Sequence, residues 1–314
     1  MPQAHVRKLS ARLVARQVSE LLLARSRRGL ALVPQERLAG FVFEVVLGGS
    51  IAHHPFRDAD TDRWIGVEDA GALGRPVNAT AIAHSMRLPH TTVRRRAAEL
   101  VAAGLLVRGP AGFSVAPDFF RGDALSRLAA EDAADLVRML RNLADSGYAP
   151  AVRSLAVGVA SLPPGVIERL ILAFSLRTLE TLTALYGDVT AGTIAAAITA
   201  ANVRRVTEDA QLARLYSSED MPPPDAVRVP ISLRALSRAI DLPFETIRRR
   251  VHALIAAGIV VRVGDGVMVP VAVLRSERHI ENNRRIALHF EQMLQALANL
   301  SSAKPVSDPF WQAG

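Results

Sequence analysis

The chain has 314 residues, half of them hydrophobic but only 5% aromatic, with a formal net charge of +8 and no cysteine. This composition excludes a disordered chain and favours a helical core of aliphatic residues, and the length suits two domains of ordinary size. The lack of cysteine excludes disulfides, thiolate catalysis and zinc–thiolate sites, while the positive charge favours a polyanionic partner such as nucleic acid.

The N-terminal region predicts two helices, near residues 6–28 and 35–50. It has no apolar core of the signal-peptide type, and no span of the chain reaches the ~18 uncharged apolar residues of a membrane helix. We therefore expect a soluble, cytoplasmic protein. The first helix is basic, which could suit a membrane surface, but we interpret it as a dimerisation helix whose solvated basic edge adds phosphate contacts. Its basic residues are Arg7, Lys8, Arg12, Arg16, Arg25, Arg27 and Arg28.

The next stretch contains histidines, acidic residues and one tryptophan. The acidic spacing lacks the glycine and the terminal glutamate of a calcium-binding EF-hand loop, so a polar surface loop is expected and no metal site is assigned. Trp64 is interpreted as a packing residue, with the lining of an effector pocket as the alternative. The histidines and aspartates of this stretch are His53, His54, Asp58, Asp60 and Asp62.

An internal repeat is the strongest feature of the sequence. Residues 76–115 align without a gap with residues 230–269, at an offset of 154 positions, and 16 of the 40 aligned pairs are identical. The helix patterns near 6–28 and 35–50 have counterparts near 165–185 and 189–214. The alternative to a shared function is a structural module that was merely duplicated, so the residues inside the repeat must decide.

The first copy predicts two helices separated by a tight turn. Asn78 suits the N-cap of a helix that runs through Met86, and Leu88-Pro89 ends it because proline disfavours helix in the residue before it. A second helix is predicted over residues 90–103, with Gly104 as its C-terminal stop. Its apolar face is formed by Val93, Ala97, Leu100 and Val101.

Two short strands are predicted after this helix, at residues 105–107 and 113–115, around the turn Gly109-Pro110-Ala111-Gly112. The second copy repeats this pattern, with a helix over residues 244–257 and the hairpin turn Gly264-Asp265-Gly266, in which Asp-Gly is a strong hairpin signal. Its apolar face is formed by Ile247, Val251, Leu254 and Ile255, and Gly258 is the stop. Helix, turn, helix and hairpin in this order is the layout of a winged helix-turn-helix.

The runs LPHTTVRRRAAELVAAGLLVR and LPFETIRRRVHALIAAGIVVR resemble the recognition helix and the start of the wing in bacterial winged-helix regulators. The order of the flanking helices resembles the MarR type, in which helices outside the DNA-binding unit dimerise. This resemblance implies a transcriptional regulator. The chain departs from that family because both units lie in one polypeptide.

The residues predicted to contact DNA lie on the face of each helix opposite its apolar residues. Arg94, Arg95, Arg248 and Arg249 are expected at base edges, because a recognition helix enters the major groove with its N-terminal residues foremost. Arg96 and Arg250 are predicted phosphate contacts. The remaining candidates are His90, Thr91, Thr92 and the wing residue Arg108 in the first copy, and Phe244, Glu245, Thr246 and the wing residue Arg262 in the second.

The two copies differ where base readout is expected. His90-Thr91 becomes Phe244-Glu245, and a carboxylate can accept from cytosine but repels phosphate. The sequence therefore favours a pseudo-palindromic operator with two unequal half-sites. The alternative left open is that one unit has degenerated and binds weakly.

The predicted fold is mainly α with small β-hairpin wings: a tandem winged helix-turn-helix in which internal duplication forms a pseudo-dimer. Unit one spans 1–150 (winged helix about 76–117) and unit two spans 151–314 (winged helix about 230–271), joined through residues 146–165. The expected partner is double-stranded DNA, and RNA polymerase, a small-molecule effector and a further homodimer stay open. No cofactor, metal or catalytic signature is present. Alternative functions are a replication initiator or chromosome-organising protein, and a protein-interaction module without DNA binding.

Overall fold

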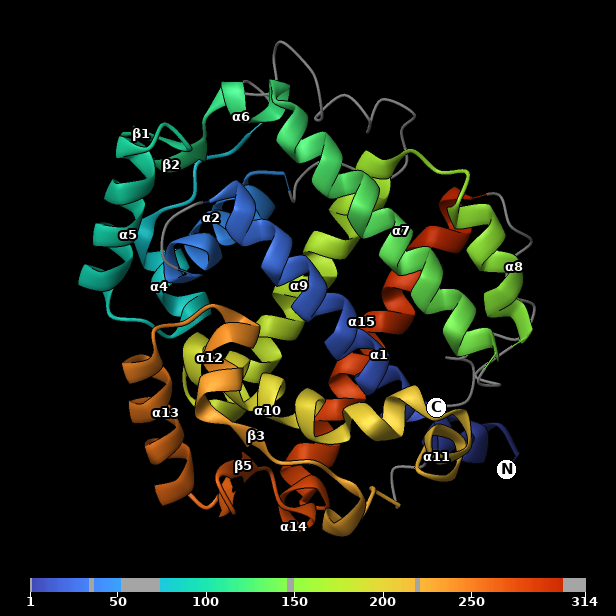
Figure 1. The fold of residues 1–314 in the computed structure, drawn as a ribbon. Coiled ribbons are helices and arrows are strands. Elements are labelled where there is room, and N and C mark those ends of the chain that lie inside the picture. Colours follow the sequence, from blue (N-terminus) through green and yellow to red (C-terminus); the bar gives the residue numbers. More distant parts are fainter. Residues whose placement is uncertain (1, 34–36, 52–73, 146–149, 218–220, 302–314) are drawn as a thin grey trace.

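The computed structural model describes residues 2–33, 37–51, 74–145, 150–217 and 221–301. Within these ranges the chain is mainly helical, with two small antiparallel sheets (Figure 1). The helices of the first half are α1 (Pro2–Leu32), α2 (Arg37–Ile51), α4 (Ala79–Met86), α5 (His90–Ala102), α6 (Pro117–Arg121), α7 (Asp123–Asp145) and α8 (Pro150–Val159).

The helices of the second half are α9 (Pro164–Tyr186), α10 (Val189–Glu208), α11 (Ala210–Leu215), α12 (Leu233–Ile240), α13 (Phe244–Ala256), α14 (Val271–Leu274) and α15 (Glu277–Leu300), with the 3-10 turn η2 (Asp225–Val227). The strands are β1 (Leu106–Gly109), β2 (Gly112–Val115), β3 (Ile231–Ser232), β4 (Val261–Val263) and β5 (Gly266–Met268). Helices α12 and α13 begin and end 154 positions after α4 and α5, so these elements recur at the offset of the sequence repeat.

The helix boundaries follow local chemistry. The side chain of Asn78 accepts a hydrogen bond from the Ala81 amide at 2.8 Å, which is the predicted N-cap of α4. The helix ends at Met86, ahead of the Leu88-Pro89 stop, because Arg87 adopts the left-handed conformation (φ 49°). Asp241 does the same after α12 (φ 49°), so both turns are closed by a non-glycine residue.

Each hairpin lies against a third extended segment. In the second half β5 pairs with both β4 and β3, and in the first half Val77 bridges to Phe113 on β2. Gly112 has a φ of 139°, and a Cβ there would lie 2.5 Å from the carbonyl oxygen of Val77. The close approach of these two backbones therefore requires glycine at this corner.

Two separate cores hold α5 and α13 in place. The predicted apolar faces are mostly buried: Val93, Ala97 and Leu100 are fully inaccessible in α5, as are Ile247 and Val251 in α13. The last residue of each predicted face, Val101 and Ile255, is half-buried. Helix α2 packs behind α5, and α10 packs behind α13. A third core lies between these two, where α1, α7, α9 and α15 form a bundle that draws residues from both halves of the chain (Figure 1).

The stretch expected only to join the halves contains a helix, α8, which contributes to the central core. Val152, Leu155, Ala156 and Val159 are buried against α7 and α15. The Pro-Pro-Gly sequence that follows these residues favours a connection, but it ends a helix and does not exclude one before it. The described part of the junction is therefore a packed element of the fold.

The expectation of a solvated basic edge on the first helix is wrong for three of its arginines. Arg12, Arg16 and Arg25 are buried, because α1 runs through the central bundle and not along its surface. Arg12 and Arg16 donate to the carbonyl oxygens of Leu274 and Ala213. Arg27 is exposed, whereas Arg7 and Lys8 have side chains outside the described set.

Arg25 stands at the centre of a buried ion cluster. It binds Asp132 and Glu168, both fully inaccessible, and its Nε lies 3.8 Å from Glu44. Arg28 also binds Asp132 and lies 2.7 Å from Asp135. The cluster links α1, α2, α7 and α9. Burial is the main cause that raises the pKa of Glu168 to about 8, so this carboxyl group holds a proton near neutral pH.

No single helix within the described ranges combines enough length and apolarity to cross a membrane. Helices α9 and α10 meet that test only when they are taken together, across a 96° bend. The predictions for His53, His54, Asp58, Asp60, Asp62 and Trp64 lie outside the described residues.

Candidate nucleic-acid interface

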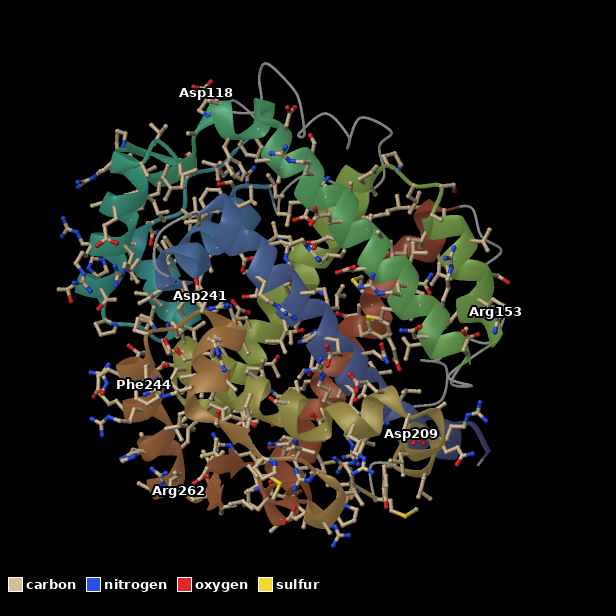
Figure 2. The ribbon with its side chains drawn as sticks, viewed as in Figure 1. Asp118, Arg153, Asp209, Asp241, Phe244 and Arg262 are labelled. Atoms are coloured by element: carbon tan, nitrogen blue, oxygen red, sulfur yellow. The ribbon has the colours of Figure 1, made fainter. Side chains whose placement is uncertain are left out.

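Helices α5 and α13 lie on the same edge of the molecule, one above the other in Figure 1. The hairpin β1–β2, which follows α5, lies at the upper end of that helix, and β5, which follows α13, lies at the lower end of the other. The two helices therefore run in opposite directions, and their N-terminal ends face the space between them. Many nitrogen-tipped side chains project from this edge (Figure 2).

The first helix of the edge presents its polar residues to solvent. His90, Thr91, Arg94 and Arg95 are exposed, and Thr92 is half-buried. Pro89 precedes the helix as a residue without a side-chain cap, so the first amides of α5 have no side-chain acceptor from the N-cap. A helix start whose amides lack a side-chain cap, with cations nearby, favours an anion such as a phosphate group.

The second helix carries the same arrangement with one charge neutralised. Phe244, Glu245, Arg248 and Arg249 are exposed, and Thr246 is half-buried. Arg248 donates to both carboxylate oxygens of Glu245, from Nε at 2.8 Å and from Nη2 at 2.6 Å. The hydrogen bond from Arg248 lowers the pKa of Glu245 below its usual range. The carboxylate is therefore ionised at neutral pH.

The third arginine of each triplet forms an ion pair with a carboxylate of the same chain. Arg96 lies 2.8 Å from Glu99 and its side chain is only 14% exposed. Arg250 lies 2.6 Å from Asp188, whose other oxygen caps α10 by accepting from the Ala191 amide. Arg250 thus ties α13 to the helix that supports it. The predicted phosphate contacts at these two positions would have to compete with these ion pairs.

The hairpin arginines extend the edge beyond the helices. Arg108 is exposed on β1 and Arg262 is exposed on β4. Nη2 of Arg262 lies 3.0 Å from Nε2 of His252, near the end of α13 that is remote from Phe244 (Figure 2). Because a guanidinium only donates, Nε2 of His252 is the acceptor in this contact.

Two cations of the edge were not anticipated from the sequence. The guanidinium of Arg234, in the first turn of α12, lies 5.6 Å from the ring centroid of Phe244. Arg87 is exposed in the turn that leads into α5. Arg234 lies in α12, the helix before α13, and Arg87 lies in the turn between α4 and α5. The signal in the sequence is an arginine at an exposed position just before each recognition-type helix. At this distance the cation is attracted to the face of the exposed Phe244 ring.

The arrangement offers cations, helix N-termini and an exposed aromatic ring to a polyanion on one edge. Within the described residues no group of three or more His, Asp or Glu side chains is arranged to hold a metal ion. No protein-family model matches the chain, and neither curated proteins nor solved structures show a significant similarity to it.

Proposed function

We propose that this protein is a sequence-specific double-stranded DNA-binding transcriptional regulator. In this proposal, two winged helix-turn-helix units that arose by internal duplication form a pseudo-dimer within one chain. Helices α5 and α13 are the recognition helices that enter the major groove, and the hairpins are wings that contact the backbone. The regulatory part of the proposal rests on the resemblance of the two RRR-containing runs to bacterial winged-helix regulators.

The observation that carries the proposal is the shared edge. Exposed pairs of arginines, Arg94 with Arg95 and Arg248 with Arg249, project from two helices whose starts face one another. Arginine bound to guanine is the commonest specific contact in the major groove. In an ordinary dimer, two-fold symmetry brings two recognition helices to one duplex, and the central bundle of α1, α7, α9 and α15 would take that part here.

The proposal includes unequal half-sites. The first helix offers two exposed arginines and no carboxylate among its first turns, whereas in the second helix Glu245 binds Arg248. Because Glu245 neutralises Arg248, this arginine attracts phosphate less strongly than an unpaired one. The bidentate pair has a defined geometry, however, and can form hydrogen bonds with a base edge. We expect the α5 half-site to contribute more to affinity and the two half-sites to differ in sequence.

A selection from a random duplex library tests the proposal, with affinities then measured by fluorescence anisotropy. The full chain should enrich one bipartite sequence, and changing Arg94, Arg95, Arg248 and Arg249 to Ala should abolish the enrichment. The matched control changes four exposed arginines on other elements, Arg138, Arg153, Arg204 and Arg285. Equal loss in both variants, or enrichment that survives the first, would contradict the proposal.

A further inference from the structure

Phe244, the first residue of α13, exposes an aromatic ring among charged side chains. The residue is 43% exposed, whereas the other aromatic residues within the described ranges are buried or half-buried. It lies at the end of α13 that faces α5 (Figure 2). Among the exposed residues of α13, Phe244 is thus the one with a large apolar surface.

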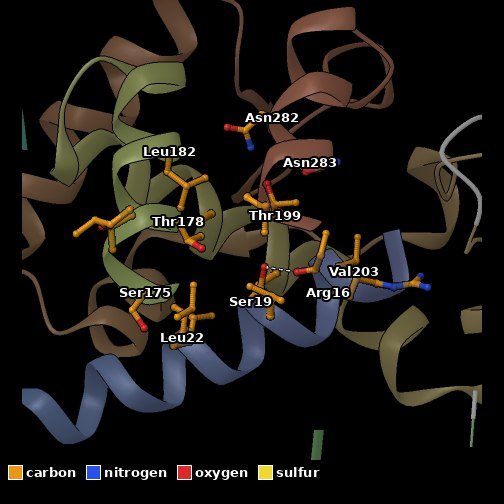
Figure 3. A pocket seen from close by; sticks show the side chains of 18 of the residues that line it. Arg16, Ser19, Leu22, Ser175, Thr178, Leu182, Thr199, Val203, Asn282 and Asn283 are labelled. Atoms are coloured by element: carbon orange, nitrogen blue, oxygen red, sulfur yellow. Dashed lines mark hydrogen bonds between the residues drawn. The ribbon is translucent and has the colours of Figure 1, made fainter. Parts of the chain in front are cut away.

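The ring belongs neither to the core of the second unit nor to an internal cavity. That core takes Ile247, Val251 and Leu254 from α13, and Phe244 lies one turn before Ile247. Figure 3 shows a cavity between α1, α9, α10 and α15, and Phe244 is not among the residues that line it. The exposed surface of the ring is therefore open to a molecule bound along the edge.

A cation lies against the ring. The guanidinium of Arg234, on α12, is 5.6 Å from the ring centroid, and Arg234 is also exposed. The first helix of a helix-turn-helix crosses the DNA backbone, so on a bound duplex Arg234 would donate to a phosphate beside the base that the ring meets. At the offset of 154, the first unit has Thr80 and His90 at these two positions. The hydrocarbon ring and its cation are therefore confined to the second unit.

The major groove offers one kind of apolar group to such a ring. Among the four bases of unmodified DNA, only thymine presents an apolar group there, its 5-methyl group, and contact with phenylalanine is one way in which proteins read it. The modified base 5-methylcytosine carries the same group at the same position. Burying one methyl-sized group corresponds to about a fourfold change in affinity.

The neighbouring residue, Glu245, distinguishes these two sources of the methyl group. Its two carboxylate oxygens accept from Arg248 at 2.8 and 2.6 Å, and each oxygen has a second lone pair for another donor. In 5-methylcytosine the methyl group lies next to a 4-amino group, which donates, whereas in thymine it lies next to O4, which accepts. A ring and a carboxylate on one base therefore match 5-methylcytosine. Thymine matches where the carboxylate meets a neighbouring cytosine.

We propose that Phe244 is a specificity-determining residue that recognises the 5-methyl group of one pyrimidine in the half-site bound by α13. This inference rests on the proposed DNA binding and adds the chemical group that the second unit reads. The first unit, with His90 at the equivalent position, does not read a methyl group in this way.

The test measures the affinity of the full chain for its selected duplex by fluorescence anisotropy. Each thymine is replaced in turn by uracil, which lacks only the methyl group, and each cytosine in turn by 5-methylcytosine. A change of about fourfold is expected at one position. Thymine as the source predicts a loss of affinity at one uracil, and 5-methylcytosine as the source predicts a gain at one methylated cytosine.

Variants of Phe244 assign this response to the ring. Phe244→His, which copies the first unit, and Phe244→Ala should both abolish the response, whereas Phe244→Leu should retain part of it. Leu288→Ala, which changes a 49% exposed apolar residue on α15, is the matched control and should respond as the parent does. If Phe244→His fails to fold by circular dichroism, Phe244→Ala still decides.

Failure of this inference is distinguishable from failure of the proposed function. Tight binding to a selected duplex that no uracil or 5-methylcytosine alters would overturn the inference alone. A methyl response that persists in Phe244→Ala would do the same, because another residue then reads the group. Absence of any selected duplex would overturn the proposed function and this inference with it.

Discussion

Glu245 holds both Nε and Nη2 of Arg248 on the exposed first turns of α13, at 2.8 and 2.6 Å. The corresponding residues of α5 are Thr91 and Arg94, and a threonine has no carboxylate to offer. One substitution between the two copies therefore changes both the charge and the readout of the second helix. This difference makes the proposed asymmetry of the operator testable with a single exchange.

Glu245→Thr, which copies the first helix, should tighten binding to random duplex DNA several-fold. It removes one negative charge and frees Arg248 for a phosphate, so the plot of log affinity against log salt concentration should steepen by about 1. Fluorescence anisotropy across a sodium chloride series measures both quantities. Glu281→Gln, which breaks the exposed pair with Arg285 on α15, should leave the slope unchanged. If Glu245→Thr leaves the affinity and the salt slope unchanged, or lowers them, Glu245 does not hold Arg248 away from DNA.

Arg95 and Arg96 should behave differently although they are neighbours. Arg95 is exposed, and its change to Ala should weaken binding to the selected operator by roughly tenfold or more while random DNA is affected less. Arg96 is paired with Glu99, so Arg96→Ala should reduce both affinities by one small common factor and flatten the salt dependence. Equal losses on both DNAs for the two variants would show that the roles are misassigned.

A single substitution in the buried ion cluster should destabilise the protein more than the replacement of three of its charged residues together. Arg25→Met removes the hydrogen bonds of Arg25 to Asp132 and Glu168 and leaves Asp132 with Arg28 alone, so it should lower the free energy of unfolding by about 3–5 kcal/mol. Replacing Arg25, Asp132 and Glu168 together by Leu, Ile and Val, the residues at the equivalent positions 179, 286 and 14, should restore most of that loss. Urea denaturation measures this, and a triple variant weaker than Arg25→Met would contradict the prediction.

Stability should fall as the pH rises toward mildly alkaline values. Burial raises the pKa of Glu168 to about 8, whereas an unfolded glutamate ionises near ~4.3. The folded state therefore keeps a proton that the unfolded state loses, and this stabilisation, complete below the unfolded pKa, disappears as the pH passes the folded pKa. The urea midpoint should decrease between pH 5 and pH 8, because this interval lies between the unfolded and the folded pKa of Glu168. The urea midpoint of Glu168→Gln should depend less on pH than that of the parent protein. If the two plots of midpoint against pH are parallel, Glu168 is not protonated in the folded state.

Local structure could be predicted from the sequence because its causes are local. Asn78 accepts from an amide three residues away, and Gly104, which follows the C-cap residue of α5, takes a φ of 73° at the predicted stop. The buried faces of α5 and α13 follow from residue spacing alone. The left-handed helix ends at Arg87 and Asp241 were not predicted, because a positive φ is uncommon at any residue other than glycine.

Long-range relationships could not be predicted in the same way. Arg25 meets Asp132 and Glu168 only after α1, α7 and α9 pack together, so the basic character of α1 alone favours a surface helix. Glu168 within the apolar run of α9 was a usable signal, because a charge in such a run often has a buried partner.

The most direct measurement of the central claim is a hydroxyl-radical footprint of the full chain on its selected duplex, with stoichiometry from analytical ultracentrifugation. We expect two protected segments on one face of the DNA, separated by about one helical turn of roughly 34–36 Å, or a multiple of it. Arg95→Ala should weaken one segment and Arg249→Ala the other, with one chain per site. A single protected segment, or loss of both segments together in either variant, would contradict a pair of recognition helices acting from one chain.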